Sequence, residues 1–502
     1  MVACAVSTGD CGRETMRRWI RLPLCAPCAW IQLWRRGAGG ASADPVPPSS
    51  RVDPARMKTM GRRQDGGNLR GGELVLRHPW SSGRGSHRGA RLRWRRVWSS
   101  TPLVLRDADL LLSAGEAAGV AAVGRALAGH PGPFRVVHIE HCMFAFHRPE
   151  LAEWARLVAA KGVEDLVFVK IPVHYFDVPL PADILRCAAL RRLFIGNWNF
   201  PATSGFPRGA DVFPHLLELY IWNTVMSARD LNHLLACSPV LQSLALALNS
   251  HPNRVRLCSQ SLQCVLLFLS KAEEVAVVDA PLLQRLVLWK ISTSYDTDDE
   301  LPVKIRLACA PELQVLGYLE PRAHQLQIGE TIIKADTKVI PSSMVPSIKV
   351  LALRVNFCVQ EEIAMLVSFL RCFPNVETLH IESDIDDEFT GQPHAKFWQE
   401  VCPVECINSH VKKIVFHDFH GDKCELEFID FIARTAQELQ ALLLMLTSKT
   451  YGPVVDVDEV NSQLGVLSFA SEECITSLLG PKVQMVHIFH RSLDLSVDDP
   501  FL

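Results

Sequence analysis

Apolar residues return along most of the chain in one spacing, apolar-x-x-apolar-x-apolar, beginning near residue 130. Clear copies start at Leu190, Leu216 and Leu241. Further copies start at Phe134, Leu262, Leu283, Leu313, Ile348, Val376, Val411 and Leu439, with a looser copy at Val163. The twelve copies are 21 to 35 residues apart, which indicates one structural unit repeated along the chain.

Each copy predicts a short β-strand whose alternate side chains point into a core. One such strand cannot bury its apolar face alone, whereas stacked strands form a continuous parallel sheet. Most spacings lie within or near the roughly 20–29 residues of a leucine-rich repeat. We therefore predict an α/β fold, an irregular leucine-rich-repeat solenoid with a parallel sheet. An ordinary α/β domain with many leucine-rich strands is the alternative, and twelve copies in one register disfavour it.

The chain must return between successive strands, and a helix is the usual return. Ser227 and Asp230 have the spacing of a capping box, with Asp in place of Glu or Gln. Leu231 and Leu234 follow at helical spacing, so a helix is predicted here. Residues 366–373 repeat this design.

The repeats are not uniform. The position three residues after the last apolar residue carries Asn249 in one copy but Trp198 and Thr224 in others, so an asparagine ladder would be degenerate. Steps of 35 residues must contain insertions, and acidic stretches lie at 296–300 and 384–388. Calcium binding by these stretches is less favoured than solvated loop charge, because the spacing of an EF-hand loop is absent.

Charge divides the 502 residues into two parts. Residues 1–100 hold 18 Arg and one Lys against six acidic residues, a net charge of +13, and the rest carries 33 basic and 48 acidic residues, a net charge of −15. The first part is rich in Gly, Ser and Pro and has no apolar period, so it cannot bury a core. We expect residues 1–90 to be a disordered segment. A transit peptide, a nucleic-acid-binding arm and a mis-set translation start are the alternatives.

Composition excludes several classes of protein. No run of 18 apolar residues is present, so a polytopic membrane protein is excluded, and a net charge of −2 argues against a nucleic-acid-binding protein. The 16 cysteines are unevenly spaced and follow no clear signal peptide, which indicates reduced thiols and not a disulfide framework. We expect a cytoplasmic or nuclear protein.

The sequence shows no recognisable enzyme motif: Walker A, G-x-S-x-G and H-E-x-x-H are absent from it. Cys25 and Cys28 form a C-x-x-C pair, but no second pair follows at zinc-finger spacing. Cys402, Cys406 and His410 offer three metal ligands, yet a strand pattern follows at once, which favours buried cysteines and a solvated histidine. We expect no catalytic residue, no metal site and no cofactor.

Four stretches of the chain resemble a known family of proteins. They are residues 93–103, residues 185–193, residues 370–381, and residues 397–399 together with 410–416 and 425–428. These stretches resemble plant F-box proteins of the FBD/leucine-rich-repeat family. The first is similar to the end of an F-box, the second and third to the family's helix-to-strand junction, and the last to its FBD region.

The resemblance implies an order of domains. The disordered segment at 1–90 would precede an F-box remnant and linker at 91–128, leucine-rich repeats at 129–394, an FBD-like region at 395–447 and a tail at 448–502. The family's expected role is substrate recognition in an SCF-type ubiquitin ligase, so the chain is expected to be an interaction protein and not an enzyme.

Members of this family bind a Skp-type adaptor through an F-box that opens with a Leu-Pro pair and continues in an apolar helical run. Leu22 and Pro23 form such a pair, but they lie about 70 residues before Arg93, and no helical run follows them. Adaptor binding is therefore doubtful. The alternative function is an orphan leucine-rich-repeat interaction scaffold without adaptor binding.

The concave face of the sheet is where we expect a protein partner to bind; neither a nucleic acid nor a membrane is expected. Side chains that flank the inward apolar pair would form this face, and aromatic and Arg residues are the usual anchors of binding patches. The candidates are Phe194, Tyr220, Trp222, Arg285, Trp289, Arg354, His380 and Lys413. Packing at the edges of the repeats is the alternative role for each.

Overall fold

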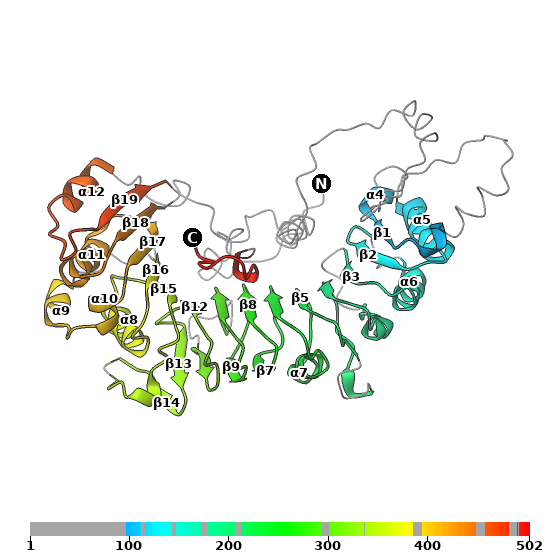
Figure 1. Cartoon of the computed structure of the whole chain (residues 1–502), viewed down its shortest axis with the longest axis horizontal. Helices are drawn as coiled ribbons and strands as arrows, with labels where there is room; N and C mark the ends of the chain where they lie inside the picture. Colours follow the sequence, from blue (N-terminus) through cyan, green and yellow to red (C-terminus); the bar gives the residue numbers. More distant parts are fainter. Residues whose placement is uncertain are drawn as a thin grey trace, which may run out of the picture.

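The computed structural model describes residues 97–111, 116–142, 147–171, 178–205, 212–293, 301–335, 337–384, 394–447, 457–480, 489 and 491–502. These residues form a solenoid that curves into an arc (Figure 1). A 14-stranded sheet lines the inner side of the arc, and helices and a second sheet cover the outer side. The predicted fold class, an irregular α/β solenoid with a parallel sheet, is confirmed. The expected disorder of residues 1–90 lies outside the described residues.

The main sheet has the strand order β1-β2-β3-β4-β5-β6-β8-β10-β12-β15-β16-β17-β18-β19, and neighbouring strands are parallel. Its strands are β1 (Leu103–Arg106), β2 (Phe134–Ile139), β3 (Asp165–Val169), β4 (Arg192–Gly196), β5 (Glu218–Trp222), β6 (Ser243–Ala247), β8 (Cys264–Phe268), β10 (Arg285–Trp289), β12 (Val315–Leu319), β15 (Val350–Val355), β16 (Thr378–Ser383), β17 (Lys413–Phe419), β18 (Ala441–Leu446) and β19 (Ile475–Leu479). Every predicted repeat supplies one of these strands, and β1 and β19 extend the sheet at its two ends.

Helices cover the outer side of the main sheet towards both ends of the arc (Figure 1). The α-helices are α4 (Ala108–Leu111), α5 (Glu116–Gly129), α6 (Arg148–Ala160), α7 (Ala228–Ala236), α8 (Gln360–Cys372), α9 (Ala395–Glu400), α10 (Glu405–Ser409), α11 (Lys423–Thr435) and α12 (Val457–Leu464). Short 3-10 helices lie at Ala182–Arg186, Thr203–Gly205 and Pro341–Ser343. Among the described residues, no helix is both long and apolar enough to cross a membrane.

The middle of the solenoid returns through strands and not through the expected helices. These strands form a second sheet in the order β14-β13-β11-β9-β7. They are β7 (Arg254–Cys258), β9 (Glu274–Asp279), β11 (Val303–Leu307), β13 (His324–Ile328) and β14 (Thr331–Ile332). The repeats here include two steps of 21 residues. A strand advances about 3.3 Å per residue and a helix about 1.5 Å, so a short return covers the same distance only when extended.

The alternation of side chains along each strand creates two apolar layers. In β4, Leu193 and Ile195 face the outer core between the main sheet and its helices, whereas Phe194 belongs to a separate inner cluster. The same alternation recurs in β5 and β10. The face of the main sheet that carries this inner cluster is called the inner face below.

Strand β12 departs from this alternation. The repeat pattern placed Tyr318 beside Leu316 in the outer core, and this expectation is wrong. Leu316 and Leu319 pack in the outer core, while Tyr318 belongs to the inner cluster. The pairing register with β15 shifts between Leu316 and Leu319, so an extra residue on β12 rotates the aromatic ring to the other side.

The position three residues after the last apolar residue of a repeat forms hydrogen bonds to a neighbouring repeat, although its residue type varies. The Trp198 indole donates to Phe168 O at 2.8 Å. Asn249 accepts from Thr224 N at 2.7 Å and donates to Ile221 O at 2.8 Å. The degenerate ladder predicted from the sequence therefore still satisfies backbone groups that the strands leave unpaired.

The predicted helix after Ser227 is α7, and Ser227 is its N-cap. The Ser227 hydroxyl accepts from Asp230 N at 3.1 Å. The carboxylate of Asp230 also accepts from Thr203 N and Oγ1, both at 2.8 Å. Asp230 thus joins this helix to the 3-10 helix Thr203–Gly205 of the preceding repeat.

The segment expected to be an F-box remnant and linker begins the solenoid. Strand β1 pairs in parallel with β2, and Leu103 and Leu105 pack in the outer core. Helices α4 and α5 follow as the first return. This part therefore covers the first end of the repeat array.

Candidate functional site

The eight residues predicted to bind a partner all lie on the inner face. Seven of them are buried, with exposed fractions between 0% and 6%, and Lys413 is half-buried. They are Phe194, Tyr220, Trp222, Arg285, Trp289, Arg354, His380 and Lys413. Neighbouring strands and a segment from the end of the chain cover them. Packing is therefore part of their role, and partner binding remains a prediction.

Aromatic rings form a row across the middle of the inner face. The rings of Phe194 and Tyr220 are stacked with centroids 6.2 Å apart, as are those of Phe268 and Trp289. The Trp289 and Tyr318 rings meet edge to face at 4.9 Å. Such arrangements add to the free energy of burying the rings, so this row is a rigid apolar platform.

A charged cluster continues the row on β12, β15 and β16. Arg354 Nε lies 2.9 Å from Glu382 Oε1, and Arg354 Nη1 lies 2.7 Å from Glu320 Oε1. Its guanidinium also lies 5.4 Å from the centroid of the Trp289 ring. Burial opposes the charged form of Arg354, but the two carboxylates outweigh this effect and raise its pKa. Two carboxylates and an aromatic face thus hold one buried cation.

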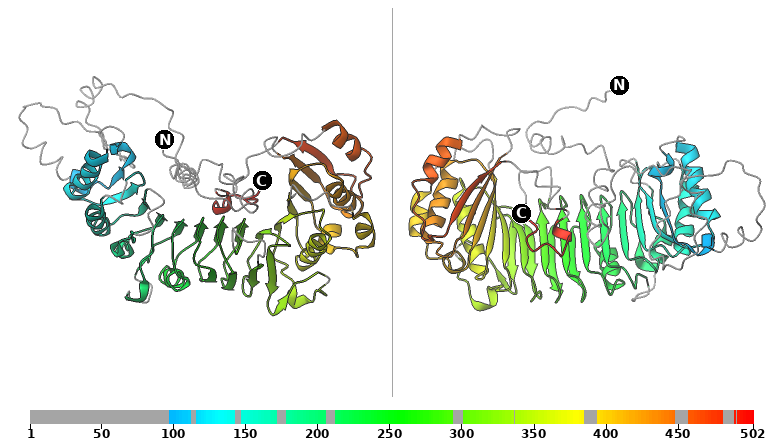
Figure 2. Two further views of the ribbon diagram at one scale, coloured as in Figure 1. Left: turned by 180° about the vertical axis from the view of Figure 1, so that it is seen from behind. Right: turned by 45° about the horizontal axis from the view of Figure 1, so that its top comes forward.

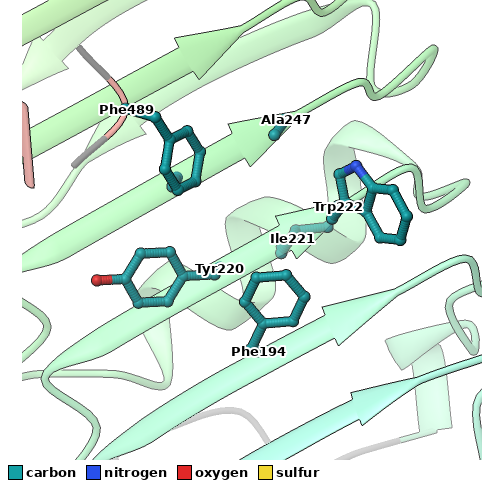
Figure 3. Close-up of a pocket in the computed structure, with 7 residues that line it drawn as sticks. Phe194, Tyr220, Ile221, Trp222, Ala247 and Phe489 are labelled. Atoms are coloured by element: carbon teal, nitrogen blue, oxygen red, sulfur yellow. The ribbon is translucent and has the colours of Figure 1, made fainter. Parts of the chain in front are cut away.

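A cleft between the Phe194–Tyr220 pair and β6 is closed by an aromatic ring from the end of the chain. Phe489 reaches over Tyr220 and Ala247 in this cleft (Figure 3). Its ring also meets Phe268 edge to face at 5.6 Å. The cavity that remains is about 10 Å³, roughly the space of one water molecule. The cleft is therefore filled by the chain itself.

The chain end continues across the inner face as residues 491–502, here called the docked segment. Figure 2 shows it, in red, within the arc and against the inner side of the main sheet. The Arg285 guanidinium donates to the carbonyl oxygens of Asp494 at 2.8 Å and Arg491 at 3.2 Å, and also to that of Val497. The Cys264 thiol donates to Ser492 O at 2.9 Å. The main chain of the segment is thus fixed over β8 and β10.

The docked segment presents a carboxylate to the basic end of the inner face. His380 Nε2 lies 3.1 Å from Asp499 Oδ2, and Lys413 Nζ lies 3.6 Å from the same oxygen. His380 Nδ1 lies 2.9 Å from His417 Nε2, so the two rings form a chain towards Asp499. Burial opposes ionisation of Asp499, but the His380 bond and the charges of His380 and Lys413 lower its pKa to about 2. The carboxylate is therefore ionised at neutral pH.

An aromatic ring of the docked segment packs beside this carboxylate. The Phe501 ring is 3% exposed and lies 5.2 Å from the Tyr318 ring, edge to face, and 5.3 Å from the His380 ring. Phe501 N donates to Asp499 Oδ1 at 3.1 Å. One carboxylate therefore contacts the inner face and orders the ring that follows it.

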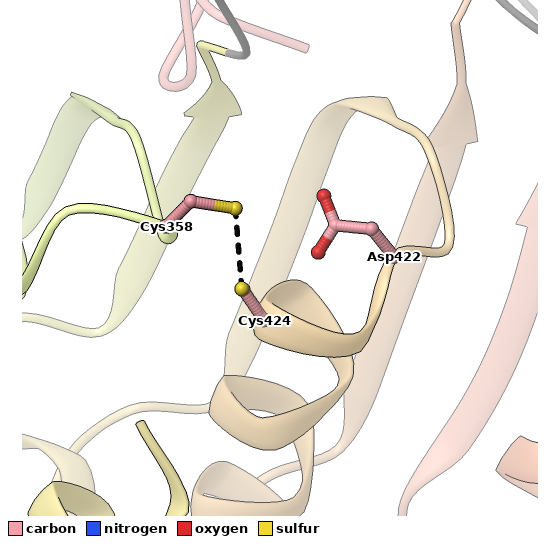
Figure 4. Close-up of side chains that lie close together, drawn as sticks. All are labelled: Cys358, Asp422 and Cys424. Atoms are coloured by element: carbon pink, nitrogen blue, oxygen red, sulfur yellow. Dashed lines mark hydrogen bonds between the residues drawn. The ribbon is translucent and has the colours of Figure 1, made fainter. Parts of the chain in front are cut away.

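Two sulfur atoms and a carboxylate gather on the outer side of the solenoid, beside α11. Cys358 Sγ and Cys424 Sγ are 3.1 Å apart, and Asp422 lies next to them (Figure 4). Asp422 already accepts from Glu425 N at 2.9 Å as the cap of α11, and burial raises the pKa of the Cys424 thiol. A structural zinc site takes four ligands. Among the described residues this cluster supplies three, and the Asp422 carboxylate already caps α11, which favours a packing contact.

The other candidate ligands also have structural roles. Asp107 groups with Glu140 and His141, but its carboxylate accepts from both of their backbone N–H groups, at 2.9 and 2.7 Å, and so fixes the end of β2. Of the residues proposed from the sequence as an alternative metal site, Cys402 is exposed, whereas Cys406 is buried and donates to Leu370 O at 3.5 Å.

Sequence reasoning missed the docked segment and the two acidic partners of Arg354. Residues 489–502 follow no repeat spacing, and no pattern in them indicates where they lie. Glu320 and Glu382 occupy positions just after or within strands, which the apolar motif does not describe. The alternation of side chains on β16 does put Glu382 on the same face as His380, so the sequence could have placed Glu382 on the inner face.

Comparison with known protein families gives two matches. Residues 151–381 match a model described as FBD-associated F-box protein At5g56370, LRR repeats. Residues 399–444 match the FBD model. No curated protein and no solved structure matches the chain. The two matches cover the middle of the solenoid with most of the inner face, and then β17 and α11. The chain therefore belongs to the family of FBD-associated F-box proteins with leucine-rich repeats.

Proposed function

We propose that this protein is the substrate-recognition component of an SCF-type ubiquitin ligase and that it binds a protein substrate on its inner face. The observation that carries the proposal is the pair of family matches, to the repeats and to the FBD region of F-box proteins. The name of the matched family refers to an F-box protein, and F-box proteins by their expected role present substrates to a ligase. The activity is recognition and not catalysis.

The inner face has the chemistry of a recognition surface. It combines an aromatic row, a buried cation held by two carboxylates, and a basic end at His380 and Lys413. Aromatic and Arg residues at the centre of a desolvated patch contribute most of the binding free energy in protein interfaces. The eight predicted residues are accordingly the proposed partner contacts.

A second function, an interaction scaffold without adaptor binding, has one observation in its favour. The matched residues are 151–381 and 399–444, and neither range is an F-box. Within residues 91–128, which the resemblance assigned to an F-box remnant and linker, the described residues form β1, α4 and nearly all of α5 of the solenoid. A stable adaptor complex needs an interface of roughly 1,200–2,000 Å² in total, so the two functions differ in whether this end of the solenoid offers an adaptor that area.

Titration of a purified Skp-type adaptor against the full chain tests the proposal. Saturable submicromolar binding supports ligase coupling. A chain starting at residue 92 shows whether the earlier residues supply the contact. Absence of binding by the full chain contradicts ligase coupling and leaves the scaffold function.

A further inference from the structure

The docked segment is held to the inner face by two kinds of contact. Arg285 and Cys264 bind only its backbone carbonyl oxygens, at Asp494, Arg491 and Ser492 among others. Every peptide carries such oxygens. These bonds therefore fix the path of a bound chain but do not select its sequence.

The side chains of Asp499 and Phe501 make the charged and aromatic contacts that can select a sequence, and Leu493 adds an apolar contact with the inner cluster. The Asp499 carboxylate meets His380 and Lys413, and the Phe501 ring packs between Tyr318 and His380. The neighbouring Asp498 is exposed. Of these two adjacent acidic residues, the one that contacts His380 and Lys413 is the one that an aromatic residue follows two positions later.

The local shape of the segment supports this pairing of side chains. Pro500 lies between the two residues, and its ring restricts the backbone. Phe501 N donates to the carboxylate of Asp499, so the turn is closed by the same group that contacts His380. A peptide ordered in this way loses less conformational entropy on binding than an extended one.

We propose that the inner face recognises peptides in which an acidic residue is followed two positions later by an aromatic residue, and that Asp499 and Phe501 occupy this site from within the chain. The inference rests on the proposed function, because it names the chemistry of the partner that the inner face takes. A partner with this chemistry displaces the docked segment. Its apparent affinity falls in proportion to the fraction of molecules whose inner face is open.

A labelled peptide with the sequence of residues 491–502 is the probe for this site. Fluorescence anisotropy measures its binding to the full chain and to a full chain with Asp499→Asn and Phe501→Ala, in which the charged and aromatic contacts of the docked segment are lost and only its backbone contacts with Arg285 and Cys264 remain. The proposal predicts at least tenfold tighter binding to the variant chain. A folded variant, with an unfolding temperature near that of the unchanged chain, that gains no affinity overturns the proposal.

Altered peptides separate the selecting contacts from the unselective ones. Peptides with Asp499→Asn or with Phe501→Ala should bind the variant chain at least tenfold more weakly than the unaltered peptide. The matched control is a peptide with Asp498→Asn, which should bind like the unaltered one because Asp498 is exposed. Equal affinity of the Asp499→Asn and Asp498→Asn peptides contradicts recognition of a specific carboxylate.

A second measurement uses the unchanged chain. It tests whether a peptide displaces the docked segment even if the variant chain does not fold. Val497 N donates to Asp494 O at 3.1 Å, and Phe501 N is bonded to Asp499. The chain is isotopically labelled, and unlabelled peptide is added at millimolar concentration, because a tethered segment has an effective concentration in that range. Displacement of the docked segment should then accelerate hydrogen exchange of these two amides. Unchanged exchange with the unaltered peptide, or the same acceleration with the Asp499→Asn peptide, refutes displacement from this site.

These outcomes are independent of the adaptor titration. If the adaptor binds and the peptides do not discriminate, the ligase function stands and the acidic–aromatic inference fails. If the peptides discriminate and the adaptor does not bind, the inner face recognises this chemistry as part of a scaffold.

Discussion

His380 and Asp499 are joined by a contact of 3.1 Å between Nε2 and Oδ2, although 119 positions separate them in the sequence. His380 lies on β16 in the second half of the arc, and Asp499 belongs to the docked segment. The contact holds the docked segment on the inner face of the main sheet. Part of the inner face is thus covered by the protein's own residues.

Leu379→Ala tests the register of the repeats. Leu379 lies beside His380 on β16, but its side chain is fully buried in the outer core. Its truncation should lower the free energy of unfolding by about 2–5 kcal/mol, the usual cost of emptying a buried leucine site. Urea titration measures the change. Leu282→Ala is the control, because Leu282 is 46% exposed and its truncation should change the free energy of unfolding little. Equal losses of unfolding free energy in the two variants would show that the register is wrong.

Arg354→Ala tests the buried charged cluster. The substitution leaves Glu320 and Glu382 without their cation, so the free energy of unfolding should fall by about 3–5 kcal/mol. Arg434→Ala is the matched control, because Arg434 pairs with Asp430 on the surface of α11 and an exposed pair contributes about 1 kcal/mol or less. Replacing Arg354, Glu320 and Glu382 together by Leu should recover most of the loss. Similar effects of the two single Arg variants would contradict the burial of the cluster.

His324 makes the protein less stable in mild acid. Its Nδ1 accepts from Glu320 N at 3.0 Å, and burial, with a smaller effect of the Arg354 charge, lowers its pKa to about 3. Between its ordinary pKa and this value the unfolded chain binds a proton that the folded chain does not, so stability falls as the pH falls. From pH 7 to pH 5 this residue should contribute a loss of about 2 kcal/mol.

Comparison with His324→Gln isolates this contribution. Gln can still accept from Glu320 N but does not titrate, and all other titratable groups are shared by the two chains. Urea titrations at pH 7 and pH 5 should give a smaller pH dependence for the variant. The same pH dependence in both chains would show that His324 is protonated in the folded state.

Trp198→Phe tests the hydrogen bond that replaces the asparagine ladder. The indole of the fully buried Trp198 donates to Phe168 O, whereas Trp222 Nε1 has no hydrogen-bond partner among the described residues. The Trp198 variant should lose about 1–3 kcal/mol more of the free energy of unfolding than Trp222→Phe, since it also leaves a buried carbonyl without its donor. If the two variants lose equal amounts, the indole bond does not stabilise the fold.

The strands of the main sheet were predictable because the signal for them is local. Alternation within six residues fixes both the strand and the side that each residue faces, as it does for Leu193 and Phe194. The second sheet was not predictable in this way. Its strands connect successive repeats. From the sequence, a helix is expected in these connections, although the shortest spacings between repeats leave too few residues for one. Tyr318 was misplaced because an extra residue on one strand leaves no trace in an apolar spacing.

The location of the candidate site followed from the sequence, but its burial did not. The alternation of side chains between the two faces of each strand is enough to place Arg285, Trp289 and His380 on one face of the sheet. Their coverage depends on a chain segment that returns from far away, with Arg285 bonded to a carbonyl 206 positions later. Such a contact depends on the three-dimensional path of the whole solenoid, which no local pattern carries.

Photo-crosslinking from position 501 tests most directly whether the docked segment covers the inner face. A benzophenone-bearing phenylalanine in place of Phe501 retains the aromatic ring and forms a covalent bond with whatever lies beside it, and peptide mapping identifies the partner strand. The structure predicts crosslinks within the same chain to β12 and β16, which carry Tyr318 and His380. Crosslinks to the outer helices, or none within the chain, would contradict the account.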